Sequence, residues 1–132
     1  MTLKNTWLWV AQLAVGGMLL FAGFNKLAGA PMMVGLFDVL GIGQWFRYLT
    51  GGLEVVGGVM LLIPSLAAFG AALLLPVMAG AILTHLVVLG DSPAIPLVLF
   101  LMLASIIWLR RERFAFITGA RVPNAIGATM RV

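Results

Sequence analysis

The chain has 132 residues, of which 63% are hydrophobic and 9% are charged, and its formal net charge is +4. A soluble domain is about half apolar and about a quarter charged, so this composition excludes a soluble catalytic domain and predicts an integral membrane protein. Cysteine is absent, which excludes disulfides, thiolate nucleophiles and Cys-ligated metal or iron–sulfur sites. The length indicates one transmembrane domain over residues 1–132.

The N-terminal part of the chain predicts one membrane span followed by a short surface helix. Residues 6–24 form an apolar run of nearly full spanning length, and Lys26 lies just beyond its end. Residues 32–40 carry apolar side chains at helical spacing, with Asp38 on the opposite side. This pattern is typical of an amphipathic helix at the membrane interface.

Three further apolar runs predict spans over residues 45–63, 66–89 and 94–109. Pro64 and Ser65 separate the first two of these runs, and a turn from Gly90 to Pro93 separates the last two. The predicted fold is therefore all-α, an integral membrane four-helix bundle with a short amphipathic helix between spans one and two. We expect the polar, basic tail at residues 110–132 to be interfacial or loosely ordered.

The positive charges of the chain are concentrated at one predicted side of the membrane. Most of them lie in the tail, at Arg110, Arg111, Arg113, Arg121 and Arg131. Because basic residues favour the cytoplasmic side, we expect both termini in the cytoplasm and the bundle in the bacterial inner membrane. Contact with the lipid bilayer and its anionic headgroups explains these charges better than nucleic acid, which we do not expect as a partner.

One carboxylic acid, Glu54, lies inside the second predicted span. On a helix, Gly51, Glu54 and Gly58 share a face, because residues three and four apart are neighbours. The two glycines predict close helix packing at this face. A carboxylate in a membrane is costly unless it is paired, protonated or hydrated, so Glu54 is a candidate ligand or proton site. The alternative is a protonated or hydrogen-bonded acid that holds helices together.

Other polar residues share the outer half of the bundle with Glu54 in the predicted topology. They are Asn25, Lys26, Arg47 and His85. The helical rise places Glu54 about 13 Å into its span and His85 about 6 Å into its own, so their side chains could meet directly or through one water. Lys26 and Arg47 also suit snorkelling anchors, and His85 also suits an interfacial histidine. A single histidine without cysteine predicts no metal site.

Two segments resemble the DoxX/DoxX-like family of small four-span membrane proteins. They are residues 21–27 (FAGFNKL) and 52–62 (GLEVVGGVMLL), with a weaker match at residues 76–81 (PVMAGA). The resemblance covers about residues 8–109, and it places the family's lysine and glutamate on Lys26 and Glu54. It implies a membrane subunit or accessory protein linked to quinone and sulfur redox chemistry, with distant relatives that act as membrane chaperones. The absence of cysteine argues against sulfur handling by thiol exchange.

Three functions stay open, and none of them decides whether the chain is an enzyme. The first is a redox-associated subunit that binds a quinone-like or other amphipathic molecule around Glu54, assisted by His85 and by Lys26 or Arg47. It has no intrinsic cofactor and requires a redox partner protein in the membrane. The second is a proton-coupled small transporter that acts as a homodimer. The third is a non-catalytic assembly factor or chaperone whose glycine-rich faces bind other membrane helices.

Overall fold

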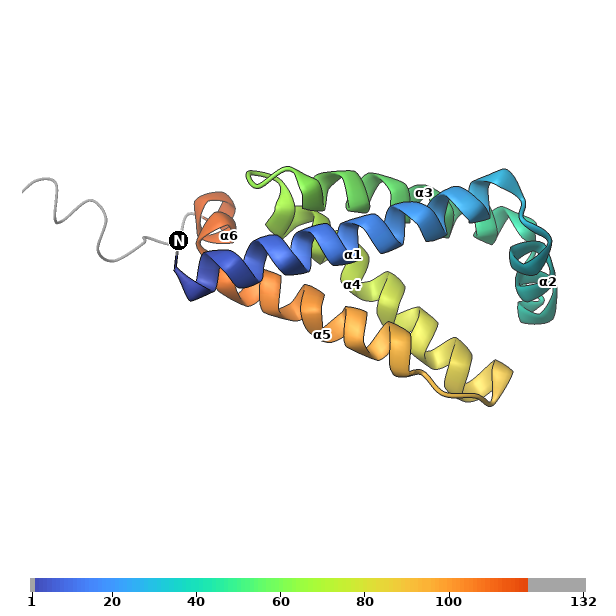
Figure 1. Ribbon diagram of the computed structural model, residues 1–132. Helices are drawn as coiled ribbons and strands as arrows, with labels where there is room; N and C mark the ends of the chain where they lie inside the picture. Colours follow the sequence, from blue (N-terminus) through green and yellow to red (C-terminus); the bar gives the residue numbers. More distant parts are fainter. Residues whose placement is uncertain (1, 119–132) are drawn as a thin grey trace, which may run out of the picture.

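The computed structural model describes residues 2–118, and every regular element in this range is helical. In chain order the elements are α1 (Leu3–Ala28), α2 (Pro31–Leu40), α3 (Gln44–Leu62), α4 (Ala67–Leu83), the π-helix η1 (Thr84–Leu89), α5 (Ala94–Leu109) and α6 (Glu112–Thr118) (Figure 1). The all-α prediction is confirmed for these residues. The expected basic tail begins with a further helix, α6, and its residues 119–132 lie outside the described part of the chain.

The helices form two antiparallel pairs, α1 with α3 and α4 with α5. Helix α3 also packs on α4, and α1 also packs on α5, so the four helices surround one core. The two pairs lie close together near the start of α1 and diverge toward the end that carries α2 (Figure 1). The bundle is therefore closed at one end and splayed at the other.

The core consists of aliphatic side chains from all four of these helices. Its members are Leu8, Ala11, Val15, Leu19, Leu61, Ala71, Leu74, Met78, Leu99, Leu103 and Ile106. Many large apolar side chains instead point outward, for example Phe21 at 72% and Val87 at 76% exposure. So much exposed apolar surface is unusual for a soluble monomer and suits contact with lipid.

Within residues 2–118, two helices are long and apolar enough to cross a membrane. They are α1 and the continuous segment Ala67–Leu89, which joins α4 to η1. Helix α5 is apolar but shorter, and α3 carries charged side chains inside its apolar sequence. The four-span arrangement therefore stays a prediction.

Glycine brings α1 and α3 into close contact at two levels. A Cβ atom added to Gly23 would lie 2.8 Å from the carbonyl oxygen of Gly51, and one added to Gly58 would lie 3.1 Å from that of Gly16. Real Cβ atoms essentially never approach to under 3.0 Å, so Gly23 cannot carry a side chain without a shift of the helices. This close approach determines which side chains of the two helices can meet.

The third predicted span ends in a form that the sequence pattern did not predict. Residues Thr84–Leu89 form a π-helix, which then ends at Gly90 with a left-handed φ of 67°. Glycine adopts this conformation without the steric cost that a Cβ atom imposes. The turn folds Asp91 back, so that its backbone N–H donates to the carbonyl oxygen of His85 at 3.1 Å.

Candidate functional site

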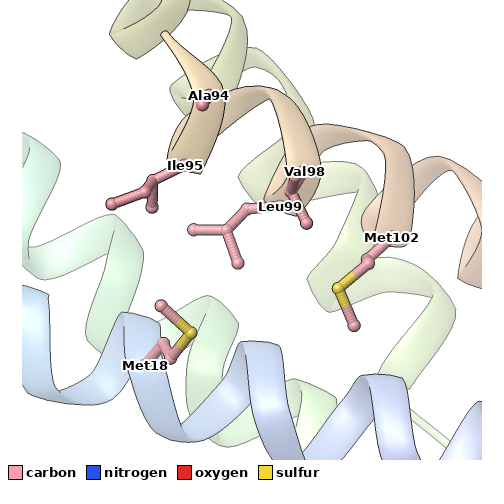
Figure 2. Close-up of a pocket in the computed structure, with 6 residues that line it drawn as sticks. All are labelled: Met18, Ala94, Ile95, Val98, Leu99 and Met102. Carbon is pink, nitrogen blue, oxygen red and sulfur yellow. The ribbon is translucent and has the colours of Figure 1, made fainter. Parts of the chain in front are cut away.

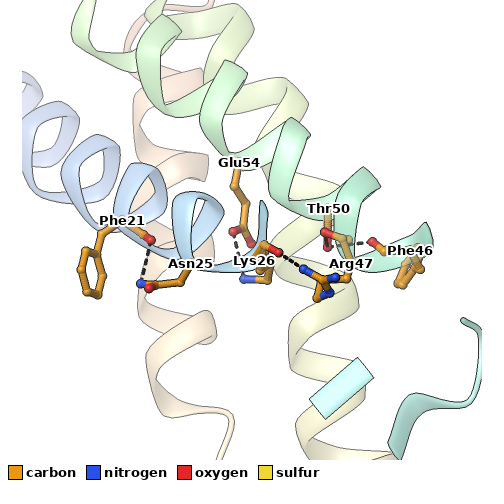
Figure 3. A network of polar contacts seen from close by, with 7 residues as sticks. All are labelled: Phe21, Asn25, Lys26, Phe46, Arg47, Thr50 and Glu54. Atoms are coloured by element: carbon orange, nitrogen blue, oxygen red, sulfur yellow. Dashed lines mark hydrogen bonds and ion pairs between the residues drawn. The ribbon is translucent and has the colours of Figure 1, made fainter. Parts of the chain in front are cut away.

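A buried ion pair between Lys26 and Glu54 forms the centre of the candidate site. The ammonium of Lys26 donates to Oε2 of Glu54 at 2.9 Å (Figure 3). Glu54 is only 3% exposed, while the side chain of Lys26 is 13% exposed. The pair joins α1 to α3 at the level where Gly23 and Gly51 let the helices approach closely. The carboxylate thus has the charged partner that its burial requires.

Arg47 is a buried cation on α3, about two turns before Glu54. It is 5% exposed, and its Nη1 donates to the backbone carbonyl oxygen of Lys26. Its guanidinium also lies over the ring of Tyr48, 4.3 Å from the centroid. The carbonyl groups at a helix C-terminus carry partial negative charge, which favours a cation there. Arg47 therefore caps the end of α1 and holds Lys26 in position through the backbone.

Gln44 extends this network to the surface helix α2. Its side-chain oxygen accepts from Nε of Arg47 at 2.7 Å, and its amide nitrogen donates to Oδ1 of Asp38 at 2.7 Å. The same nitrogen donates to the carbonyl oxygen of Val34 at 3.0 Å. Hydrogen bonds thus connect the end of α1, the body of α2 and the start of α3 around the ion pair.

Two of the residues predicted for this site have other partners. The side-chain amide of Asn25 donates to the carbonyl oxygen of Phe21 on its own helix at 3.0 Å. Nδ1 of His85 lies 2.6 Å from Oδ1 of Asp91. Within residues 2–118, no hydrogen bond or ion pair joins His85 to Glu54.

The structure therefore brings Glu54 and His85 into no direct hydrogen bond or ion pair, and the alternative contact through one water stays a prediction. The helical rise gives only the depth of each residue in its own span, whereas η1 continues α4 away from the α1–α3 pair at the splayed end of the bundle (Figure 1). Gly90 then turns the chain so that Asp91 takes the position beside the imidazole. Within the described residues, no group of three or more His, Cys, Asp or Glu side chains could hold a metal ion.

An apolar groove lies between α1 and the start of α5, in the splayed half of the bundle. Its volume is about 280 Å³, and it is lined by Met18, Ala94, Ile95, Val98, Leu99 and Met102 (Figure 2). The two methionine side chains face it from opposite helices. Methionine is flexible and polarisable, so it adapts to apolar ligands of different shape.

One buried polar residue, Gln12, was missed by the sequence analysis. It is fully buried, its amide nitrogen donates to the carbonyl oxygen of Leu61 at 3.0 Å, and its oxygen accepts from Nε of Arg110 at 3.0 Å. The only available signal was one amide inside an apolar run. Gln12 joins α1, α3 and the end of α5 at the closed end of the bundle.

Comparison with known proteins assigns the family of the chain. Residues 10–109 match the DoxX-like family. No curated protein and no solved structure matches the chain. The family and the two long apolar helices together indicate a membrane protein. Since the match covers most of the sequence, the chain belongs to the DoxX-like family.

Proposed function

We propose that the chain is a redox-associated membrane subunit or accessory protein that binds a quinone-like or other amphipathic small molecule. The binding site is the Lys26–Glu54 pair, in the outer half of a bundle that resides in the bacterial inner membrane with both termini in the cytoplasm. One observation carries the proposal. A partly exposed ammonium, held by a buried carboxylate, lies in the splayed half of the bundle that also contains an apolar groove.

The ion pair has unused hydrogen-bonding capacity for a polar headgroup. An ammonium has three donors, and within the described residues Lys26 uses one of them, on Glu54. A remaining donor suits the carbonyl oxygen of a quinone. The carboxylate of Glu54 suits the acceptance of a proton from the corresponding quinol hydroxyl. Arg47 does not reach Glu54 and acts instead by fixing the end of α1.

The spacing between the groove and the ion pair suits an amphipathic molecule. Met18 in the groove precedes Lys26 on α1 by two turns, which is about 12 Å along the helix and about 80° around it. A ligand with its polar head at Lys26 and its apolar part along α1 would thus reach the groove residues. Apolar lining with a few convergent polar groups is the usual composition of a small-molecule site.

The proposal includes a second protein that supplies the electron-transfer cofactor. The sequence has no cysteine, and its paired glycines at 51–52 and 57–58 lie within α3 rather than in a loop that binds nucleotides. The chain would then bind and orient the small molecule and exchange protons with it, while the partner transfers electrons.

Binding of quinone analogues to the purified full-length protein tests this function. Short-chain benzoquinones and naphthoquinones would be titrated in neutral detergent by calorimetry. A hydrogen bond to a charged group contributes roughly 1.5–3 kcal/mol, so Lys26→Met and Glu54→Gln are each expected to weaken binding by roughly ten- to a hundredfold. Lys4→Met and Glu112→Gln are the matched controls. They make the same two types of substitution, and so remove one positive and one negative charge, at the other end of the bundle.

The outcome separates this function from its rivals. Unchanged binding in Lys26→Met and Glu54→Gln would remove the ion pair from the site. Flux of protons with a lipophilic or cationic substrate in proteoliposomes would instead favour the dimeric transporter. Gly51 and Gly58 pack on α1 within the chain, so they offer no support for an assembly factor that uses these two glycines to bind other proteins.

A further inference from the structure

The closed end of the bundle holds a polar cavity that the proposed function does not use. Its volume is about 200 Å³, and it is lined by Lys4, Asn5, Leu8, Leu109, Arg110, Glu112 and Arg113. It lies between the start of α1 and the junction of α5 with α6, two segments that are distant in the sequence and adjacent in space (Figure 1). This volume is below the range of about 300–1,000 Å³ that drug-sized ligands occupy.

One cation of this cavity is held in place by the core. Nε of Arg110 donates to the side-chain oxygen of Gln12 at 3.0 Å, and Gln12 is itself fully buried and bonded to the carbonyl oxygen of Leu61. The terminal nitrogens of Arg110 form no hydrogen bond with any residue of the described chain. The core thus fixes the orientation of the guanidinium and leaves its two terminal nitrogens available as donors. A pair of N–H donors in this planar arrangement matches the geometry of phosphate oxygens.

The positive charge in this cavity exceeds the negative charge. Lys4, Arg110 and Arg113 line it together with one carboxylate, Glu112. The ion pairs within residues 2–118 are Lys26–Glu54 and His85–Asp91, so none of these three cations has a carboxylate partner there. Partial burial lowers the pKa of Arg110, and the charge of Arg113 lowers it further. An anion bound between these groups would relieve this repulsion.

The neighbouring Arg111 shows that not every arginine here faces the cavity. Its Nη1 donates to the carbonyl oxygen of Trp108 at 2.8 Å, and its guanidinium lies over the Trp108 ring at 4.5 Å. It does not line the cavity. Arg111 therefore carries the same charge at almost the same place in the sequence and is the natural control.

We propose that this cavity is a binding site for a phosphate group, with Arg110 as the oriented donor and Lys4 and Arg113 as the flanking cations. The cavity lies beside the ends of apolar helices, where the phosphate of an anionic phospholipid would be found. Free phosphate has the same chemistry, so both sources belong in the test.

The experiment measures binding of trace phosphatidylglycerol to the full-length protein in neutral detergent micelles. Such micelles provide no anionic surface that could attract the protein. A difference in phosphatidylglycerol affinity between the variants therefore reports the cavity itself. At a contribution of about 1 kcal/mol for each basic side chain, Arg113→Gln is expected to weaken binding about fivefold, and Lys4→Gln/Arg113→Gln about 30-fold. Arg111→Gln should change binding less than twofold. Circular dichroism and gel filtration verify that each variant is folded.

Parallel titrations with phosphatidylcholine and inorganic phosphate distinguish the sources. Phosphatidylglycerol that binds while inorganic phosphate does not assigns the site to a lipid headgroup, and the reverse assigns it to free phosphate. Equal binding of phosphatidylglycerol and the zwitterionic phosphatidylcholine would overturn the proposal. So would binding of neither probe, or an equal loss in Arg111→Gln and Arg113→Gln.

Discussion

The two partners of the buried ion pair differ in how well each tolerates the loss of the other. Glu54 lies inside the helix interface at 3% exposure, and within the described residues no cation other than Lys26 forms an ion pair with its carboxylate. Lys26 is 13% exposed and lies in the last turn of α1. A long ammonium side chain near a helix end can extend toward the interface, and the helix dipole favours a cation there.

Removal of Lys26 should therefore destabilise the protein more than removal of Glu54. Breaking a buried ion pair by removing one partner costs up to about 3–5 kcal/mol, and the partial exposure of Lys26 reduces this to about 2 kcal/mol for Lys26→Met. Glu54→Gln should cost about 1 kcal/mol or less. The measurement is the free energy of unfolding in detergent, with circular dichroism as the probe of unfolding.

The double variant provides the decisive comparison. Lys26→Met/Glu54→Gln should be more stable than Lys26→Met alone, because no unpaired charge remains in the interface. If the two single changes are additive in the double variant, the two side chains do not interact in the folded protein, and the ion pair cannot be the centre of the site.

The same residues show what the sequence could predict about the site. Lys26 and Glu54 follow from the family resemblance and from a topology that places both in one half of the bundle. The partner of His85 does not follow from the sequence, because Asp91 lies in the Gly90–Pro93 turn and suits an ordinary turn residue. The π-helix that precedes this turn has no clear signal in the sequence. Gln12 was missed because an uncharged amide in an apolar run does not reveal that it is buried.

At the scale of helices, length and turn residues predicted the order of the elements well. The predicted 94–109 agrees with α5, and the predicted 45–63 differs from α3 by one residue at each end. The turns that precede α2, α3, α4 and α5 carry glycine or proline, which interrupt helices and so mark boundaries in the sequence. The turn between α5 and α6 consists of Arg110 and Arg111 and has no such signal. The divergence of the two helix pairs has no such local signal, because it depends on which faces pack together (Figure 1).

The close packing of α1 on α3 predicts opposite effects for two glycines of the same helix. A Cβ atom on Gly23 would contact the Gly51 carbonyl oxygen at 2.8 Å and Val55 at 2.9 Å, whereas one on Gly17 would have no neighbour within 4 Å. Gly23→Ala should therefore cost about 1–3 kcal/mol through overpacking. Gly17→Ala should leave stability unchanged or raise it by up to about 1 kcal/mol, because alanine favours helix.

Thermal unfolding of the two alanine variants in detergent tests this contrast. Because Gly23 also lies beside the Cβ of Glu54, Gly23→Ala should weaken quinone-analogue binding as well, while Gly17→Ala should not. Equal stability of the two variants would mean that the helices separate more readily than the contact distances indicate, and that glycine at position 23 is not required for close approach.

For the molecule as a whole, the two polar regions lie at opposite ends of the bundle. The ion pair of Lys26 and Glu54 lies in the splayed half, and the cavity of Lys4, Arg110 and Arg113 lies at the closed end. If the bundle spans the membrane, each region faces a different side. The excess of arginine predicts that the closed end lies in the cytoplasm, which would direct the phosphate site to the inner leaflet and the ion pair to the outer half.

The absence of native cysteine makes this orientation directly testable. Ser65 lies in the turn between α3 and α4, and Ser92 lies in the turn between η1 and α5, and both are exposed. Four spans with cytoplasmic termini place Ser65 on the cytoplasmic side and Ser92 on the opposite side. A membrane-impermeant maleimide should therefore label Ser92→Cys in right-side-out vesicles and Ser65→Cys only in inside-out vesicles.

The labelling pattern also decides between four spans and fewer. Because α4 and η1 alone separate the two serines, labelling of both from the same side would show that this segment does not cross the membrane, and the four-span prediction would fail. The reverse pattern would keep the four spans but invert the bundle. The phosphate site would then face the outer leaflet, and Lys26 and Glu54 would be reached from the cytoplasmic half, where a redox partner would have to bind.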